Sequence, residues 1–394
     1  MDSRKFRGGR GGTPAFVRPI LNSLSEMRAE PMRPAQLNRK AEELLLEAFG
    51  AEVGATESAF AHGAVDLMVE HTHYFDGFGL FCSLPEGTSV AVRANKSEAN
   101  RITILEDERG LKEAGDRALD VLLQGSDTRV DVAVISNTPF ALSPRVGASA
   151  LVATVRAVRA LESRSSTEAE DLSGLDDPKG PDRHYEAARI MASRPTDEPA
   201  YVLVDTRTHE YLSLDVPSLE RPGLAAVLFD TVGQAPVHGE HRKMLRTLTA
   251  ALKDGPFPKI RSVRDIEHRQ LEAALAAVDR AHRPLLTYLV TENGRVQKLV
   301  AAIQRRDWQM FGALLLMSHA SKGTGLGLGT AETDLIVSGV ENMSLEGMYG
   351  ATRLSSANRA VLVAGQLFSI PPALERLRTS FEDKYEDSLT TLLL

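Results

Sequence analysis

Cysteine, tryptophan and long apolar runs are scarce in this sequence of 394 residues, which has one cysteine, Cys82, and one tryptophan. A single thiol excludes an intrachain disulfide and a cysteine-rich metal site, and it is typical of a reducing cytosol. Because no run of about 18 apolar residues occurs, we expect no membrane-spanning helix and no membrane partner. The N-terminal residues also lack the apolar stretch of a signal peptide, so we expect a cytoplasmic protein.

A strong excess of either charge is absent as well. The formal net charge is −7, and charged residues make up 25% of the chain. This balance provides no basic field over the whole chain that would favour nucleic acid. Apolar residues make up 43%, which is enough for a sizeable core, and the length predicts two domains or one two-lobed unit.

The first 34 residues are basic and rich in glycine and proline, so we expect a flexible tail. Within it, Arg7-Gly8-Gly9-Arg10-Gly11-Gly12 is similar to an RGG element, which can bind single-stranded nucleic acid weakly. A plain solvated tail is the alternative, and we expect no other contact with nucleic acid.

Apolar periodicity predicts an α+β fold, because strands and helices are mixed without regular βαβ alternation. The expected strands are 89–92, 101–105, 130–135, 201–205, 225–229 and 360–364, and the expected helices are 36–49, 148–161, 241–252, 265–278, 285–304 and 373–385. Residues 162–183 are rich in acidic residues, Ser, Gly and Pro, which predicts an acidic loop. We therefore expect an N-terminal lobe over 35–200 and a C-terminal lobe over 201–394.

A dense polar motif, GAVDLMVEHTHYFDG, runs from Gly63 to Gly77. Carboxylates and imidazoles can bind a polar ligand, because they accept from, or bridge between, neighbouring hydroxyls. Glu70, His71 and His73 are the candidates. The alternative interpretation is a polar turn between a strand and a helix.

A second motif, PRVGASA, covers residues 144–150 and leads into a predicted helix. Small residues let backbone N–H groups approach phosphates, and the helix dipole favours an anion there. Arg145 could pair with phosphate or block the loop. A simple helix start is the alternative.

Two further segments lie towards the C-terminus. Residues 350–360 read GATRLSSANRA before an apolar strand, and TENGRV at 291–296 precedes Phe311-Gly312 and Ser318-His319-Ala320-Ser321. We expect His319 to be a hydrogen-bonded structural residue. The glycines of 323–329, GTGLGLG, lack the G-K-[ST] ending of a phosphate loop, so a flexible loop is expected there.

In this order the motifs resemble those of the galactokinase branch of the GHMP small-molecule kinases. That family has G-R-x-N-L-I-G-E-H-T-D-Y-x-x-G, then G-x-G-L-S-S-S-A, then E-N-x-R-V followed by F-G-x-L-M-x-x-S-H-x-S, and finally G-A-R-M-T-G-G-G-F-G-G. The resemblance covers roughly residues 36–370, with a poor fit between 162 and 200. It implies a two-lobed α+β fold with a ligand cleft between the lobes.

The resemblance also implies which residues would bind ligands. The sugar would be bound by Glu70, His71, His73 and His238. The phosphates of ATP would be bound by Arg145, Gly147, Ala148 and Ser149, and Ser149 would also hold Mg²⁺.

Several family residues are replaced. Ala64 stands where the family has an arginine that aids catalysis, and His73 stands where an aspartate clamps the sugar. Residues 188–190, where the family's catalytic aspartate would fall, contain no carboxylate, although Asp177 or Asp182 could reach the cleft. Losing two such groups costs roughly 10²–10⁴-fold in rate or more. We therefore expect ATP-dependent phosphorylation of a galactose-type sugar at the anomeric hydroxyl, with catalysis weakened or lost. The alternative is a non-catalytic sugar- or nucleotide-binding protein that acts as a sensor or scaffold.

Overall fold

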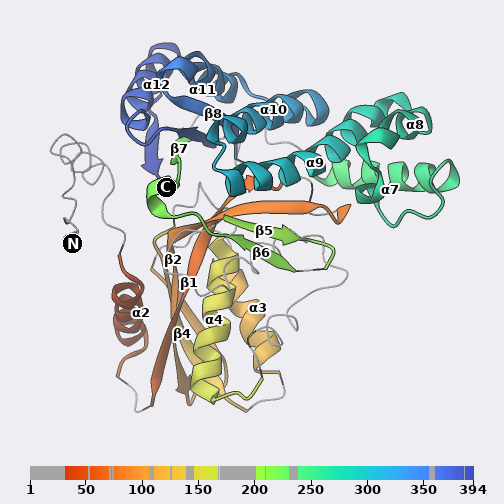
Figure 1. Cartoon of the computed structure of the whole chain (residues 1–394). Coiled ribbons are helices and arrows are strands. Elements are labelled where there is room, and N and C mark those ends of the chain that lie inside the picture. Colours follow the sequence, from red (N-terminus) through yellow and green to blue (C-terminus); the bar gives the residue numbers. More distant parts are fainter. Residues whose placement is uncertain are drawn as a thin grey trace, which may run out of the picture.

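The structure is a computed structural model (Figure 1). It describes residues 32–394 apart from 52–53, 71, 73–74, 106–110, 125–126, 139–145, 167, 169–200, 209, 230–237, 355–359 and 386. The expected N-terminal tail and most of the expected acidic loop therefore lie outside the described residues.

The first of two sheets is built around one long strand. Its strands are β1 (Thr56–Met68), β2 (Phe78–Asn95), β3 (Arg101–Ile104), β4 (Arg129–Ser136), β5 (Tyr201–Asp205) and β6 (Tyr211–Leu214). Their order is β3-β4-β2-β5-β6, with β1 also paired to β2, and β3–β4 is the one parallel pair among these described strands.

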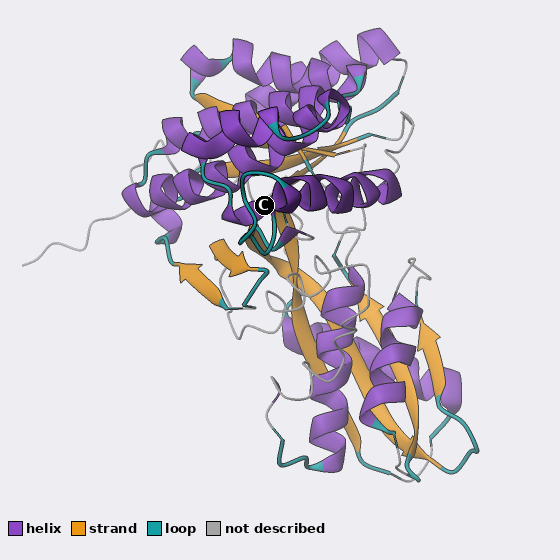
Figure 2. Cartoon of the chain, turned by 90° about the vertical axis from the view of Figure 1, so that its right-hand side faces the viewer, coloured by secondary structure: helices purple, strands orange, loops and turns teal. Residues whose placement is uncertain are grey.

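Helices cover both faces of the wider end of this sheet (Figures 1 and 2). Helix α2 (Pro34–Phe49) lies on one face, and α3 (Leu111–Leu122) and α4 (Val146–Glu162) lie on the other. Successive side chains of a strand point to opposite faces. Accordingly Ala91 packs under α2, whereas Val90 and Val92 pack with the cluster that includes α3 and α4.

The second sheet has the order β10-β7-β9-β8 and is antiparallel. Its strands are β7 (Gly223–Leu228), β8 (Met348–Arg353), β9 (Ala360–Gly365) and β10 (Thr390–Leu393). Helices α11 (Ala331–Asn342) and α12 (Ile370–Tyr385) pack on one face through a separate core cluster, and α10 (Trp308–Leu326) packs on the other.

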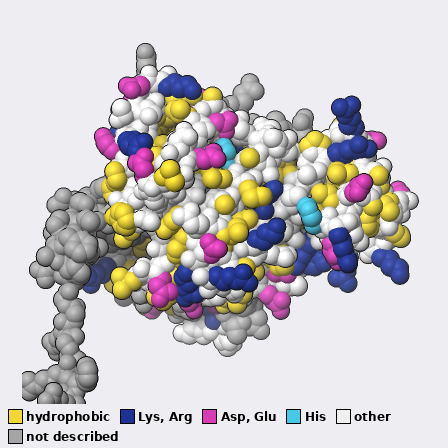
Figure 3. Space-filling view, turned by 45° about the horizontal axis from the view of Figure 1, so that its top comes forward, with side chains coloured by type: hydrophobic (Ala, Val, Ile, Leu, Met, Phe, Trp, Pro, Cys, Tyr) yellow, Lys and Arg dark blue, Asp and Glu magenta, His cyan; other side chains and the backbone are white. Residues whose placement is uncertain are grey.

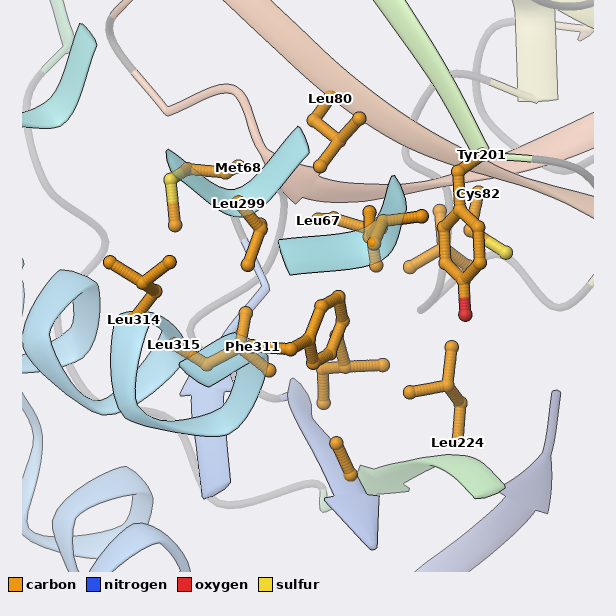
Figure 4. Close-up of a cluster of buried hydrophobic side chains, with 14 of the residues drawn as sticks. Leu67, Met68, Leu80, Cys82, Tyr201, Leu224, Leu299, Phe311, Leu314 and Leu315 are labelled. Carbon is orange, nitrogen blue, oxygen red and sulfur yellow. The ribbon is translucent and has the colours of Figure 1, made fainter. Parts of the chain in front are cut away.

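The two sheets share a core. Figure 4 shows Leu67 and Leu80 of the first sheet facing Phe311 of α10 and Leu224 of β7. Helix α9 (Arg283–Arg305) adds Leu299 to this cluster, and α7 (His238–Asp254) and α8 (Leu271–Ala276) pack against the other end of α9. The segment that joins β1 to β2 consequently lies where the two sheets and α9 meet (Figure 1).

The α+β class is confirmed, and so are most of the expected elements. The single helix expected at 265–278 is wrong. Two 3₁₀ turns, Val263–Asp265 and His268–Gln270, precede the short α8, because Ile266 between them is extended and buried. Strand β5 begins at residue 201, and both β5 and β6 join the first sheet, so the lobe boundary near residue 200 stays a prediction.

The flexible loop expected at 323–329 is also wrong, because α10 continues to Leu326 and ends at Gly327, which has φ 67°. Gly325 packs so tightly against α9 that a Cβ there would lie 2.8 Å from Cβ of Tyr288. Tertiary packing therefore stabilises the helix in spite of the low helix propensity of glycine. Among the helices that the structure describes, none has the length and apolar character needed to cross a bilayer.

Candidate functional site

The polar motif at 63–77 begins within β1, and its residues 69–77 connect β1 to β2 and not a strand to a helix, as the alternative interpretation has it. After β1 the chain turns, with Thr72 Oγ1 donating to Val69 O at 2.9 Å and Gly77 N donating to Thr72 O at 2.9 Å. Gly77 has no room for a side chain, because a Cβ would lie 2.7 Å from Thr72 O. The described part of the turn is therefore tightly fixed.

Helix α9 holds the same turn from the other side. The Tyr288 hydroxyl donates to Glu70 O at 2.8 Å, and Asn293 Oδ1 accepts from Phe78 N at 3.0 Å. Tyr288 thus anchors the start of the turn, and Asn293 of the TENGRV segment, which shows no obvious chemistry in the sequence, anchors the first residue of β2.

Glu70 is the buried centre of this region, with an exposed fraction of 2%. Its Oε2 lies 3.8 Å from Lys322 Nζ and its Oε1 lies 3.5 Å from Arg353 Nη2. Neither carboxylate oxygen accepts a hydrogen bond from the described residues. The two cations counter the charge of the carboxylate. Because both ion-pair distances are too long for good hydrogen bonds, the carboxylate oxygens keep their capacity to accept hydrogen bonds.

The two cations are themselves buried and held in place. Lys322 Nζ donates to Thr352 Oγ1 at 3.3 Å and to Arg353 O at 3.2 Å, and Arg353 donates to Leu328 O. Burial lowers the pKa of Lys322, and the negative charge of Glu70 opposes that shift. Sequence reasoning assigned no role to either residue. The local sequence gives no signal for them, because Lys322 lies between Ser321 and Gly323 and Arg353 follows Thr352.

His319 lies beside this cluster, and its hydrogen bonding confirms the expectation of a structural role. Its Nδ1 accepts from Arg353 N at 3.4 Å, so Nε2 carries the proton and donates to Asp334 Oδ1 at 2.9 Å. Burial lowers the pKa of His319, and the hydrogen bond to Asp334 opposes the shift without cancelling it. The imidazole is therefore neutral near pH 7.

A second buried ion pair lies further along α9 and α10. Glu292, with no exposed surface, accepts from Arg295 and from Ser318. Arg295 Nη2 also donates to Ser321 Oγ at 2.6 Å. These contacts explain why the sequence here is polar: it supplies the hydrogen bonds that a buried carboxylate requires.

Ala64 has a different environment from Glu70. It is 7% exposed and packs in an apolar cluster with Val69, Phe81 and Ala148. Where the family has an arginine, this chain therefore has an apolar contact between β1 and α4.

The start of α4 is the candidate phosphate site. Its first turn contains no acidic residue, and it begins with small residues, which fits the approach of an anion. Ser149 is buried, and its hydroxyl lies 2.7 Å from Thr88 Oγ1 of β2, within the α4–β2 interface. Ala148 is buried, and Gly147 lies in the first turn.

Other expected ligand residues are not placed by the structure. His71, His73 and Arg145 lie outside the described residues, as do Asp177 and Asp182, and His238 begins α7 with a side chain that is not described. Among the described residues no group of three His, Cys, Asp or Glu side chains could hold a metal ion. Phosphate and Mg²⁺ binding at α4 stays a prediction.

Comparison with solved structures defines the class of the fold. Lactococcus lactis galactokinase, solved with galactose, has a TM-score of 0.73 at 16% identity, covering 89% of this chain and 96% of that one. A mevalonate kinase from L. major, solved with R-mevalonate, has a TM-score of 0.58 at 13% identity, covering 87% of this chain and 97% of that one. The protein has the α+β fold of the GHMP kinases.

Comparison of sequences narrows the class. The family model described as the galactokinase galactose-binding signature matches residues 45–94, which include Glu70 and its turn. Galactokinase from Roseiflexus sp. (strain RS-1) is 26% identical over 75% of this chain and 80% of its own length. The Pasteurella multocida galactokinase is 22% identical over 84% of this chain and 89% of its own length. The chain is therefore similar in sequence to galactokinases over most of its length, and it carries the galactose-binding signature of that branch of the GHMP kinases.

Proposed function

We propose that the protein binds a galactose-type sugar at the turn between β1 and β2, and that it transfers phosphate from ATP to the anomeric hydroxyl slowly. The observation that carries the sugar site is Glu70, a buried carboxylate whose two oxygens accept no hydrogen bond from the described residues. Buried polar atoms nearly always have such partners, and the exceptions require an explanation. Sugar hydroxyls are donors that would provide one.

The surrounding residues give this carboxylate the properties that sugar binding needs. Lys322 and Arg353 balance its charge without occupying its lone pairs, and Tyr288 fixes its backbone. A site of this kind discriminates by hydrogen bonding, because a ligand that lacks the matching hydroxyl leaves the carboxylate unsatisfied. The solved galactokinase that this chain resembles contains galactose, which supports the same ligand class here.

Slow phosphoryl transfer is proposed because of Ala64. Its methyl group offers no positive charge to stabilise the transferring phosphoryl group, and it packs into an apolar cluster. Positioning of sugar and nucleotide would still accelerate the reaction. In our proposal the first turn of α4 binds the phosphates of ATP, whose bound Mg²⁺ neutralises phosphate charge, and the Glu70 turn, with His71, His73 and His238 near it, orients the sugar.

The test combines binding and turnover in the full-length protein. Galactose would be titrated by calorimetry, and ADP release would be followed with and without sugar. Glu70→Gln is expected to weaken galactose binding by at least about tenfold, since a hydrogen bond to a charged group contributes about 1.5–3 kcal/mol. Glu98→Gln is the matched control, because Glu98 is exposed after β2 and its replacement also removes one negative charge.

Glu70→Asp is the second variant, in case Glu70→Gln does not fold. It keeps a negative charge between the two cations, but its shorter side chain withdraws the carboxylate from the sugar. Loss of galactose binding in both Glu70 variants, with the wild-type Tm nearly kept in Glu70→Asp, supports the sugar site. Unchanged binding in a folded Glu70→Asp or Glu70→Gln variant would refute it.

The second candidate function is a sugar sensor without catalysis, which the apolar surroundings of Ala64 favour. Galactose binding without sugar-dependent ADP release, even at micromolar enzyme and over hours, would establish this alternative. Measurable sugar-dependent ADP release that Glu70→Gln abolishes would exclude it.

A further inference from the structure

A groove of about 520 Å³ lies between α9 and α10, on the helical part of the molecule. Six of its lining residues are Arg280, Arg283, Thr287, Thr291, Arg295 and Ser321. Its walls come from the first half of α9, the 3₁₀ turn before it (Arg280–His282) and the last turns of α10. The candidate phosphate site lies elsewhere, at the start of α4.

Small residues of α10 create this hollow. Gly325 and Thr324 line it on the α10 side, and Gly325 lies directly against Tyr288 of α9. A side chain at residue 325 would push the helices apart, because its Cβ would lie 2.8 Å from Cβ of Tyr288. Gly325, one of the glycines for which the sequence predicts a loop, therefore forms part of one wall of the groove.

The charged side chains that line the groove are all cationic. Its lining contains three arginines and no aspartate or glutamate. The side chain of Arg280 makes no ion pair or hydrogen bond within the described part of the chain, and the side chain of Arg283 has one long contact, 3.5 Å from its Nε to Val278 O. Guanidinium groups cannot accept a hydrogen bond, so a ligand here must supply the acceptors.

The base of the groove adds an oriented donor. Arg295 Nη2 donates to Ser321 Oγ at 2.6 Å, which leaves the Ser321 proton to be donated. Within the described residues that proton has no acceptor. Arg295 itself is held by Glu292 and Thr291, so its position is fixed in advance.

The charge of the surrounding segment points to the same kind of ligand. Residues 238–305 contain thirteen lysines and arginines and seven aspartates and glutamates, although the whole chain has a net charge of −7. Figure 3 shows dark blue Lys and Arg side chains gathered on the right of the molecule, where Figure 1 places α7, α8 and α9. A local positive field of this kind attracts anions.

We propose that this groove binds the phosphate group of a small phosphorylated molecule. Arginine forks match the oxygens of phosphate in paired hydrogen bonds. Arg280 and Arg283 have no anionic partner among the described residues, so together with Arg295 they suit a group that carries about two negative charges. The volume is that of a small-molecule site. The proposal rests on the arginines, none of which contacts Glu70, although Tyr288, which donates to Glu70 O, also lines the groove.

The test is a calorimetric titration of the full-length protein with inorganic phosphate, pyrophosphate and glucose 6-phosphate at constant ionic strength. Sodium acetate is the carboxylate control. The test variant, Arg280→Gln with Arg283→Gln, is compared with Lys298→Gln with Arg305→Gln. Both variants lose two positive charges, but Lys298 and Arg305 are exposed on α9 outside the groove.

The expected result is that the phosphate compounds bind and acetate does not. Binding should weaken about tenfold or more in the groove variant and change less than about twofold in the control, because the groove arginines would donate charge-assisted hydrogen bonds. Tighter binding of glucose 6-phosphate than of inorganic phosphate would identify an ester as the ligand, and the reverse would identify the free anion. Failure of all three compounds to bind at millimolar concentration, or equal losses in both variants, would overturn the proposal.

Discussion

Replacing Lys322 with methionine tests how Glu70 is held. Lys322 has no exposed surface, and its ammonium lies 3.8 Å from the Glu70 carboxylate. Removing one partner of a buried ion pair costs about 3–5 kcal/mol. Because Arg353 also faces the carboxylate at 3.5 Å, Glu70 keeps one counter-charge, so a loss of about 3 kcal/mol is expected. Methionine conserves the volume, so no cavity adds to this figure.

The measurement is a double-mutant cycle in urea. Glu70→Gln alone should also cost about 3 kcal/mol or more, because it leaves two buried cations without an anion. Glu70→Gln combined with Lys322→Met should cost about 1–3 kcal/mol less than the sum of the single changes. Trp308, at the start of α10 and in contact with the shared core, provides the fluorescence signal. Additivity of the two changes within about 0.5 kcal/mol would refute the inferred coupling.

Three further predictions concern packing and protonation. Gly312→Ala should destabilise the fold by several kcal/mol in urea unfolding, because its Cβ would lie 2.0 Å from a carbonyl oxygen of β8. Gly294→Ala is the control: nothing lies within 4 Å of its Cβ, so it should stabilise the fold by about 0.5–1 kcal/mol. The folded-state pKa of His319 is lowered by burial, so the unfolded chain binds more protons below about pH 6.5 and wild-type stability should fall there; a wild-type curve parallel to that of His319→Gln between pH 5 and 7 would contradict this. Burial raises the pKa of the Cys82 thiol to about 12, so a thiol reagent at pH 8 should label it only after unfolding, and rapid labelling of the native protein would count against the buried position.

Local patterns predicted the elements well where periodicity and burial agree. The buried strand at 201–205 and the long amphipathic α9 lie where the sequence predicts them. The segment at 323–329 failed because glycine has a low intrinsic helix propensity, and only the contact with Tyr288 in α9 shows why helix forms there. Contacts of that kind join residues far apart in the chain and leave no local pattern.

The site shows the same limit. Glu70 could be predicted because it lies in a dense polar motif, but the identity of its partners depends on how α10 and β8 fold back onto β1. Arg353 stands where the family motif has methionine. Taken alone, this substitution suggests that the glycine-rich loop has lost its function. In the structure this arginine, together with Lys322, faces Glu70 and donates to Leu328 O.

This matching of charges bears on how the motifs diverged. A buried arginine introduced without an anion would cost several kcal/mol, and an unpaired buried carboxylate would do the same. In this chain the carboxylate of Glu70 lies between Arg353, from the motif at 350–360, and Lys322 of α10. The stability of the fold requires counter-charges for the buried carboxylate, but it does not require that the carboxylate oxygens stay able to accept hydrogen bonds from a ligand. Such an arrangement is expected where a ligand rich in hydroxyls still binds, so the altered motifs favour retained sugar recognition even if phosphoryl transfer is slow.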